Sequence, residues 1–447
     1  MDNTSRWRAR VVDGLSTRLW PLPALGVLLG TIAGVLLPTV DSGQLSGWPR
    51  TLIFEGDASA ARSVLSAIAS SLVSAATLTF SLTVVAFQLA SSQASPRLLR
   101  QFSQDRAVQL TLAIFLGTFA FALTLLRSVH GDVVPRFSVT VACLMTLICV
   151  VVLVMFLGHV ASLLRLETMM RDVHETTNRT IDVVCSQAKD ADPREVPHPQ
   201  DGQFVAVVEA EDSGFVTEMR RSALIERAKE LGVVFRELHP VGDSVIAGTP
   251  LLQWWSTQPH TPADPDRAAR VAEAGRAAVV LGYERTGVAD VGFGLRQLVD
   301  VCIRALSPGV NDPTTAVHAL SHITAVLGSL VVLPEQPAVL ADEDGRPRLV
   351  VRVHDIRDLL RLGFEQPRHY GSGDPQVAER LLTACWELAW IAQDTHHLPA
   401  IQEETRRTLD AVRAQQPGPE RSREYDELAG RVFALAEAAG GPPALRG

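Results

Sequence analysis

The sequence has few cysteines and no excess of basic residues, and each shortage excludes a class of protein. Its 447 residues include five cysteines, with no C-x-x-C pair, so neither a disulfide framework nor a zinc site is expected. Lys and Arg total 41 against 49 Asp and Glu, a net charge of −8, which leaves no basic footprint for nucleic acid. The sequence also lacks G-x-S-x-G, a Walker loop and G-x-G-x-x-G after a strand, so we expect no enzyme and no cofactor.

Charge is also missing from four long apolar stretches near the N-terminus. A bilayer core of about 30 Å requires about 20 mostly apolar helical residues. The stretches of that length are Leu19–Val40, Val64–Ala90, Ala107–Leu126 and Phe137–Leu164. The first has no obvious cleavage site after it, so we interpret it as an uncleaved anchor. None contains Asp, Glu, Lys or Arg, which argues against a transporter with a buried acidic relay.

Arginines beside these stretches predict their direction, because basic residues gather in cytoplasmic loops. On one side lie Arg6, Arg8, Arg10, Arg18, Arg97, Arg100, Arg106, Arg165, Arg171 and Arg179. The other side has Arg50, Arg62, Arg127 and Arg136. Both termini are therefore predicted to be cytoplasmic, and the third and fourth spans to form an antiparallel hairpin.

The second span carries a stripe of polar residues. Its members recur at steps of three, four or seven: Ser63, Ser66, Ser70, Ser74, Thr77, Ser81, Gln88 and Ser92. At about 100° per residue they fall within an arc of about 80°. Val84 and Val85 interrupt the stripe. The expected apolar face opposite consists of Leu72, Val73, Leu78, Leu82, Phe87 and Leu89.

Two interpretations of this stripe remain open. Small hydroxyl residues let membrane helices approach closely and hydrogen-bond their neighbours. Alternatively, Ser66, Ser70, Ser74, Thr77, Ser81, Gln88 and Ser92 line a water-filled path between several subunits, with Val84 and Val85 as an apolar constriction. Gln88 favours the second interpretation, since its amide costs more to bury without a partner than a hydroxyl does.

The rest of the sequence predicts an α+β region with a sheet-rich part and a helical part. A helical extension to about Cys185 and a linker rich in Asp, Pro and His come first. The predicted domains are an N-terminal segment (1–18), a four-helix membrane domain (19–164), the extension and linker (165–202), a small β-rich, barrel-like module (203–258) and a helical domain (259–447). The module resembles biotinyl and lipoyl carrier domains at Val241–Val245, but no lysine stands at the hairpin tip, so a carrier role is not expected.

The helical domain contains three groups of residues that we considered as sites. In the loop Ser307–Pro313, Ser307, Gly309, Asn311 and Asp312 could bind a ligand or take part in gating, or the loop could simply connect two helices with Asp312 as N-cap. His318 and His322 have the i, i+4 spacing that two metal ligands can use, but no H-E-x-x-H pattern is present, and no metal is predicted. Gln366 and Arg368-His369-Tyr370 could contact a ligand or a neighbouring subunit, or belong to a surface turn.

Two segments carry a resemblance to a known family. Phe80–Gln93, running into Ser95–Leu99, is similar to the signature of bacterial membrane proteins grouped as domain of unknown function 2254. Arg296–Asp300 and Ala305–Pro313 match the second signature of that family. The resemblance covers nearly the whole chain and implies a bacterial inner-membrane protein of this layout, but it implies no activity or ligand. A contact between the two signatures is a further hypothesis.

The sequence favours a homo-oligomer in membrane lipid whose second span lines a path for small ions, regulated by the cytoplasmic domain. The alternative is a non-conducting membrane-anchored sensor or scaffold whose cytoplasmic domain binds a ligand or partner protein. The two differ in where the stripe lies: toward a central axis, or packed against the other spans. Ion selectivity, gating stimulus and subunit number are not encoded in any pattern that we find.

Overall fold

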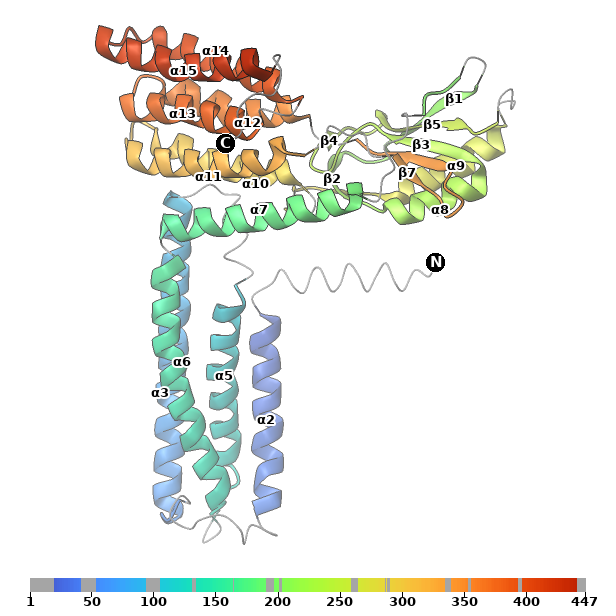
Figure 1. Ribbon diagram of the computed structural model, residues 1–447. Helices are drawn as coiled ribbons and strands as arrows, with labels where there is room; N and C mark the ends of the chain where they lie inside the picture. Colours follow the sequence, from blue (N-terminus) through green and yellow to red (C-terminus); the bar gives the residue numbers. More distant parts are fainter. Residues whose placement is uncertain are drawn as a thin grey trace, which may run out of the picture. The chain divides into compact units, whose positions relative to one another are not determined.

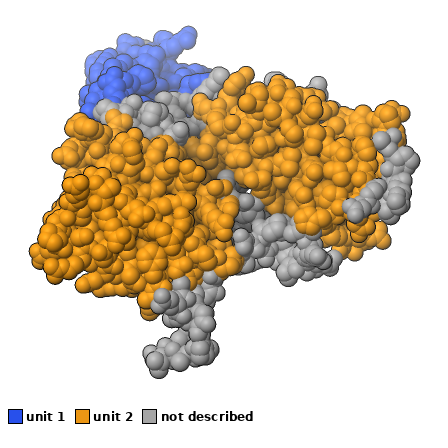
Figure 2. All heavy atoms as spheres, turned by 90° about the horizontal axis from the view of Figure 1, so that it is seen from above, with its two compact units in different colours: residues 1–169 blue, residues 170–447 orange. Residues whose placement is uncertain are grey.

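The computed structural model describes residues 20–41, 54–93, 105–130, 134–163, 165–189, 197–200, 203–258, 264–285, 287, 290–333, 339–352, 355–392 and 396–439. The chain forms two compact units, Met1–Met169 (unit 1) and Met170–Gly447 (unit 2), coloured separately in Figure 2. The boundary falls inside one helix, and each unit is described by itself.

Unit 1 is built from four long helices that run side by side (Figure 1). They are α2 (Pro21–Asp41), α3 (Ala58–Gln93), α5 (Arg106–Leu126) and α6 (Arg136–Leu163). Each contains most of one predicted span. Among the described residues, five helices are long and apolar enough to cross a membrane, these four and α11 (Pro313–Val331) of unit 2. The chain therefore has several helices that could span a membrane, and the count of four remains a prediction.

Helix α2 packs against α5 through glycines spaced one turn apart. A Cβ atom at Gly26 would lie 2.3 Å from the carbonyl oxygen of Ala113, and one at Gly30 would lie 2.0 Å from that of Gly117. A Cβ atom at Gly34 would lie 2.8 Å from the Cβ atom of Thr124. Such distances leave no room for a side chain, so the glycines set how closely the two backbones approach, as small residues do between membrane helices.

Helix α3 packs on α5 and α6 through a face of mostly small side chains. Its buried residues are Ala61, Leu65, Ile68, Ala69, Leu72, Ala76, Thr79, Thr83 and Ala86. Part of this face shares a core with Phe115, Phe121 and Leu125 of α5. Of the apolar residues expected opposite the stripe, only Leu72 belongs to the fully buried set, whereas Val73, Leu78 and Leu89 are exposed.

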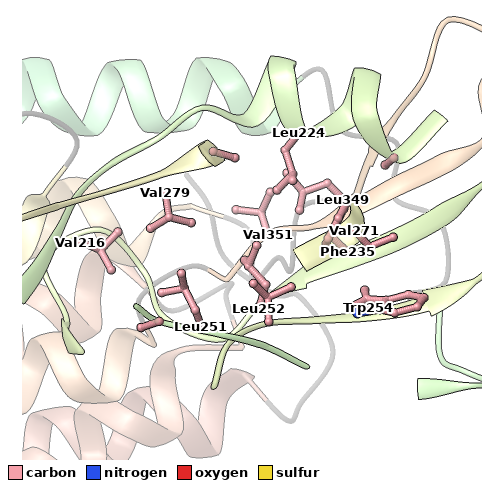
Figure 3. Close-up of a cluster of buried hydrophobic side chains, with 14 of the residues drawn as sticks. Val216, Leu224, Phe235, Leu251, Leu252, Trp254, Val271, Val279, Leu349 and Val351 are labelled. Carbon is pink, nitrogen blue, oxygen red and sulfur yellow. The ribbon is translucent and has the colours of Figure 1, made fainter. Parts of the chain in front are cut away.

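Unit 2 opens with α7 and a sheet-containing part. The elements are α7 (Leu166–Lys189), β1 (Val205–Glu209), β2 (Gly214–Met219), α8 (Arg221–Leu231), β3 (Val233–Glu237), β4 (Ser244–Val245), β5 (Pro250–Ser256), α9 (Pro265–Ala278) and β6 (Val279–Gly282). One sheet has the order β1-β5-β3-β8-β7, with only β3 and β8 parallel, and the other has the order β4-β2-β6. Figure 3 shows their shared core, which includes Leu224, Phe235 and Leu252.

The remaining elements are mainly helices. They are α10 (Val291–Ala305), α11 (Pro313–Val331), β7 (Val339–Ala341), β8 (Pro347–Val350), α12 (Ile356–Gly371), α13 (Pro375–Ile391), α14 (Leu398–Arg413) and α15 (Pro419–Ala439). Helix α11 contacts α10, α12 and α13, and α13 in turn contacts α14 and α15, so the helices form a layered stack (Figure 1). Pro417 lies between α14 and α15, and Pro419 begins α15.

The predicted helical domain 259–447 also contains three strands, which corrects the expectation of helices alone. Helix α9 ends at Ala278, and β6 follows it to pair with β2. Strands β7 and β8 form a hairpin that extends the larger sheet next to β3. The sheet-containing part therefore draws strands from beyond the predicted module 203–258, and the described strands make two sheets instead of one barrel.

Candidate functional site

The polar stripe of α3 lies on the surface of unit 1. Its described members Ser66, Ser70, Ser74, Thr77, Ser81 and Gln88 are all exposed. The interrupting valines are exposed too, Val84 by 37% and Val85 by 48%. The side chain of Ser92 lies outside the described residues. The centre of the stripe is about 150° around the helix from the centre of the packed face, at about 100° per residue, so the stripe points away from α5 and α6.

Hydroxyl groups on α3 donate hydrogen bonds to carbonyl oxygens of the same helix. Ser74 donates to the carbonyl oxygen of Ser70 (3.1 Å) and Thr77 to that of Val73 (2.9 Å). Such bonds lower the cost of placing a hydroxyl in an apolar surrounding. The amide of Gln88 has no such bond among the described residues. In lipid this side chain would therefore keep unpaired donors and acceptors, which is costly.

A polar pair joins the ends of α5 and α6. Nε2 of His159 lies 2.6 Å from Oδ2 of Asp105, and the other carboxylate oxygen of Asp105 accepts a hydrogen bond from the backbone nitrogen of Ala107 (2.8 Å), so Asp105 caps α5. This pair was not predicted from the sequence. An Asp directly before Arg106, at the start of an apolar run, is a capping signal that could have suggested it.

The loop Ser307–Pro313 connects α10 and α11, and Asp312 is the N-cap of α11, as the helix-start interpretation predicts. Its carboxylate accepts hydrogen bonds from the backbone nitrogen of Thr315 (3.1 Å) and the Thr315 hydroxyl (2.6 Å). These bonds to Thr315 lower the pKa of Asp312. The Ser307 hydroxyl donates to the carbonyl oxygen of Arg304 (2.7 Å). Gly309 and Asn311 are exposed, the latter at a left-handed φ of 48°, and a ligand-binding or gating role for the loop stays a prediction.

The structure brings His322 to a histidine of another helix and leaves His318 exposed. The rings of His322 and His174 of α7 lie 5.2 Å apart in an edge-on contact. No group of three or more His, Cys, Asp or Glu side chains in the described part of the chain is placed to hold a metal ion.

The group around Arg368 is largely engaged inside unit 2. Arg368 forms a part-buried ion pair with Glu404 of α14, so its guanidinium is not free for a ligand. His369 and Tyr370 are exposed and stack edge-on at 4.8 Å. They lie in the last turn of α12 and not in a surface turn. The Oε1 atom of Gln366 is buried without a hydrogen bond from the described residues.

Comparison with known proteins identifies the family of this chain. The model of the family described as predicted membrane protein, domain of unknown function 2254, matches residues 16–387. The chain belongs to this family. Curated relatives include an uncharacterised protein of Mycobacterium bovis and others of two Mycobacterium tuberculosis strains, each 34% identical over 450 residues, covering 97% of this chain and 81% of the relative. No solved structure matches.

The two signatures of this family map onto different units. The first covers the end of α3, and its continuation Ser95–Leu99 lies outside the described residues. The second covers α10 and the loop before α11 in unit 2. The hypothesis of a contact between the two signatures therefore stays a prediction.

Proposed function

We propose that this member of the domain of unknown function 2254 family assembles into a homo-oligomer of the bacterial inner membrane in which α3 of each copy lines a path for small ions. In this proposal α2, α3, α5 and α6 span the bilayer with both termini in the cytoplasm. Unit 2 then serves as a cytoplasmic collar that holds the copies together and regulates the path.

The observation that carries this proposal is the position of the stripe. Packing within one chain, the simpler explanation of small hydroxyl residues, would bury the stripe against α5 or α6. Instead Ser70, Ser74 and Thr77 are exposed, and the buried face is a different one. An exposed polar stripe that includes the Gln88 amide favours contact with water or with another copy over contact with lipid.

Val84 and Val85 give the path a place to close. They interrupt the stripe toward its Gln88 end and are exposed on its side of α3. A ring of valines contributed by several copies would form an apolar constriction that water leaves readily, which is one way in which channels gate.

Cysteine accessibility in a cysteine-free background tests the proposal. Single cysteines at Ser70, Ser74 and Thr77 should react with a membrane-impermeant thiol reagent in lipid vesicles. Leu78 is the matched control, because it is 62% exposed in the single chain yet lies beyond the edge of the stripe. A cysteine there should stay unreactive in lipid. Absence of labelling at all stripe positions of folded protein would remove the pore.

Ion flux supplies the second readout. Val84→Ser and Val85→Ser should raise flux through reconstituted vesicles severalfold, because a hydroxyl lowers the barrier that an apolar ring imposes. Val73→Ser changes an exposed valine one residue before Ser74 and away from the proposed constriction, so flux should stay at the level of the unmodified protein.

A non-conducting sensor or scaffold is the second candidate, and the hydrogen bonds of the stripe favour it. Since Ser74 and Thr77 satisfy their hydroxyls within α3, these residues do not require water, and the stripe could bind another copy directly. In that case Ser74→Leu should disrupt assembly, with no flux to lose and no labelling of stripe cysteines.

A further inference from the structure

Helix α7 is the covalent link between the two units. The division between the units falls between Met169 and Met170, inside α7. The helix begins shortly after α6 ends, and most of it belongs to unit 2.

Helix α7 packs on the rest of unit 2 through a few buried side chains. Its buried residues there are Met170, Val173, Thr177 and Ile181. Thr177 lies against Gly294 of α10, where a Cβ atom would come within 1.9 Å of the threonine hydroxyl oxygen. The Thr180 hydroxyl donates to the carbonyl oxygen of Gly287 (3.2 Å). These contacts hold α7 in one register on α10.

Two histidines bring α7 and α11 into contact. The rings of His174 and His322 lie 5.2 Å apart at 68°. Nε2 of His174 lies 3.0 Å from Nδ2 of Asn178 and accepts its hydrogen bond, so the neutral ring carries its N–H at Nδ1, which is buried and has no hydrogen-bond partner among the described residues. A second N–H, at Nε2, would face the donor nitrogen of Asn178 and lose this bond, which is unfavourable.

Among the described residues, no carboxylate is recorded as acting on His322. Burial, and then the proximity of His174 and His318, lower the pKa of His322. On α7 itself, Glu175 is engaged by Arg171 (3.0 Å) and Arg179 (3.5 Å). On the neighbouring α10, Asp300 pairs with Arg296 (3.0 Å). The groups that act on His322 are thus other histidines, which repel it once they are charged.

We propose that His174 and His322 form a proton-sensitive latch, which holds α7 on α11 when both rings are neutral and releases it when they are protonated. Histidine is the side chain whose ordinary pKa, about 6.5, lies in the range that cells reach. In the docked state burial disfavours protonation of His322, and on release this ring takes up a proton more readily. Docking is therefore complete above about pH 6.5 and weakens as the pH falls below it.

The latch does not depend on the pore, because it concerns only the docking of α7 within unit 2. Spin labels at Thr176→Cys on α7 and Ser321→Cys on α11, both exposed positions, report the distance between the helices in the full chain. We expect one narrow distance distribution at pH 7.5 and a second, longer population at pH 5.5. An unchanged distribution in the otherwise native chain would overturn the proposal without any further variant.

Two sets of variants identify the groups responsible. The double variant His174→Gln and His322→Gln, which cannot be protonated, should keep the narrow distribution at both pH values, and the single variant His322→Gln serves if the double variant does not fold. His369→Gln removes an exposed histidine of α12 and should leave the response intact. A response that persists in the double variant, or that disappears in His369→Gln, would assign the effect to other groups.

Discussion

Aspartates at helix starts organise much of unit 2 at the residue scale. The side chains of Asp264, Asp290, Asp312, Asp355 and Asp374 each accept a hydrogen bond from a backbone nitrogen in the first turn of the helix that follows. These bonds satisfy donors that have no partner inside the helix. The segments before α9, α10, α11, α12 and α13 are thereby tied to the helix that follows each of them.

Asp312 gives the clearest prediction of this kind. Asp312→Ala removes the acceptor of both bonds to Thr315, and we expect the start of α11 to lose about 1 kcal/mol of stability, as is usual for an N-cap. Hydrogen exchange of the first-turn amides in the full chain in detergent measures this loss. Since hydrogen bonding lowers the pKa of Asp312, its share of stability is present above the ordinary carboxyl pKa and fades as the pH falls through the lowered value.

Asp312→Asn is the matched control, because an amide oxygen also caps helices well. It should exchange nearly as slowly as the unmodified chain. If Asp312→Asn stayed folded yet lost the flux or assembly of the unmodified protein, the charge itself would matter, and ligand binding by the loop would displace capping as its role.

The caps also show how far residue patterns reach. Proline follows Asp264, Asp312 and Asp374 and is favoured at the first helical position, so the sequence signals these three caps. Asp290 and Asp355 have no proline after them and lack this signal. Asp290 has a second role that no local pattern encodes, since its carboxylate also accepts two bonds from Arg285, each of 2.9 Å.

At the scale of elements, the glycines of α2 determine a contact that a single methyl group should break. In Gly30→Ala the new Cβ atom would lie 2.0 Å from the carbonyl oxygen of Gly117, so α2 must move away from α5 or tilt. We expect a lower midpoint of thermal unfolding in detergent by several degrees, because overpacking typically costs about 1–3 kcal/mol.

Gly158 of α6 provides the control for this change. A Cβ atom there meets nothing within 4 Å, and alanine is the better helix former. Gly158→Ala should therefore leave the midpoint unchanged or raise it slightly. Equal effects of the two substitutions would mean that the close approach of α2 and α5 does not contribute to stability.

Elements whose partners lie far along the chain were the ones that sequence patterns missed. Each predicted apolar stretch coincides with a helix, since length and lack of charge suffice to predict a helix that could span a membrane. Val279–Gly282 continues the pattern of α9 and becomes a strand only because β2 pairs with it. The hairpin of β7 and β8 had a local signal, Asp344-Gly345 between two apolar runs, which is typical of a tight turn and was overlooked.

At the scale of the whole molecule, the exposed position of the stripe could not be derived from α3 alone. The periodicity separated a polar face from an apolar face that includes Leu78 and Leu89, and it left open whether that apolar face meets lipid or packs. The bundle buries a face rich in alanine. Which face of a helix packs depends on its neighbours, and no pattern within one helix contains that information.

The number of membrane crossings depends on whether α11 enters the bilayer. Helix α11 is apolar and long enough to span, but we expect it to remain in the cytoplasm. Its start is capped by Asp312, it carries His318 and His322, and it contacts α10, α12 and α13. These contacts bury its apolar residues without lipid.

Reporter fusions test this topology in the cell. Fusions after Val40 and Val129 should score as extracytoplasmic, and one after Arg106 as cytoplasmic, because arginines gather on that side. Fusions after Gln258, which precedes α11, and at Gly447 show whether α11 crosses the membrane. Both should score as cytoplasmic, since α11 packs inside unit 2. Opposite scores would place α11 in the bilayer, and extracytoplasmic scores for both would overturn the orientation derived from the arginines.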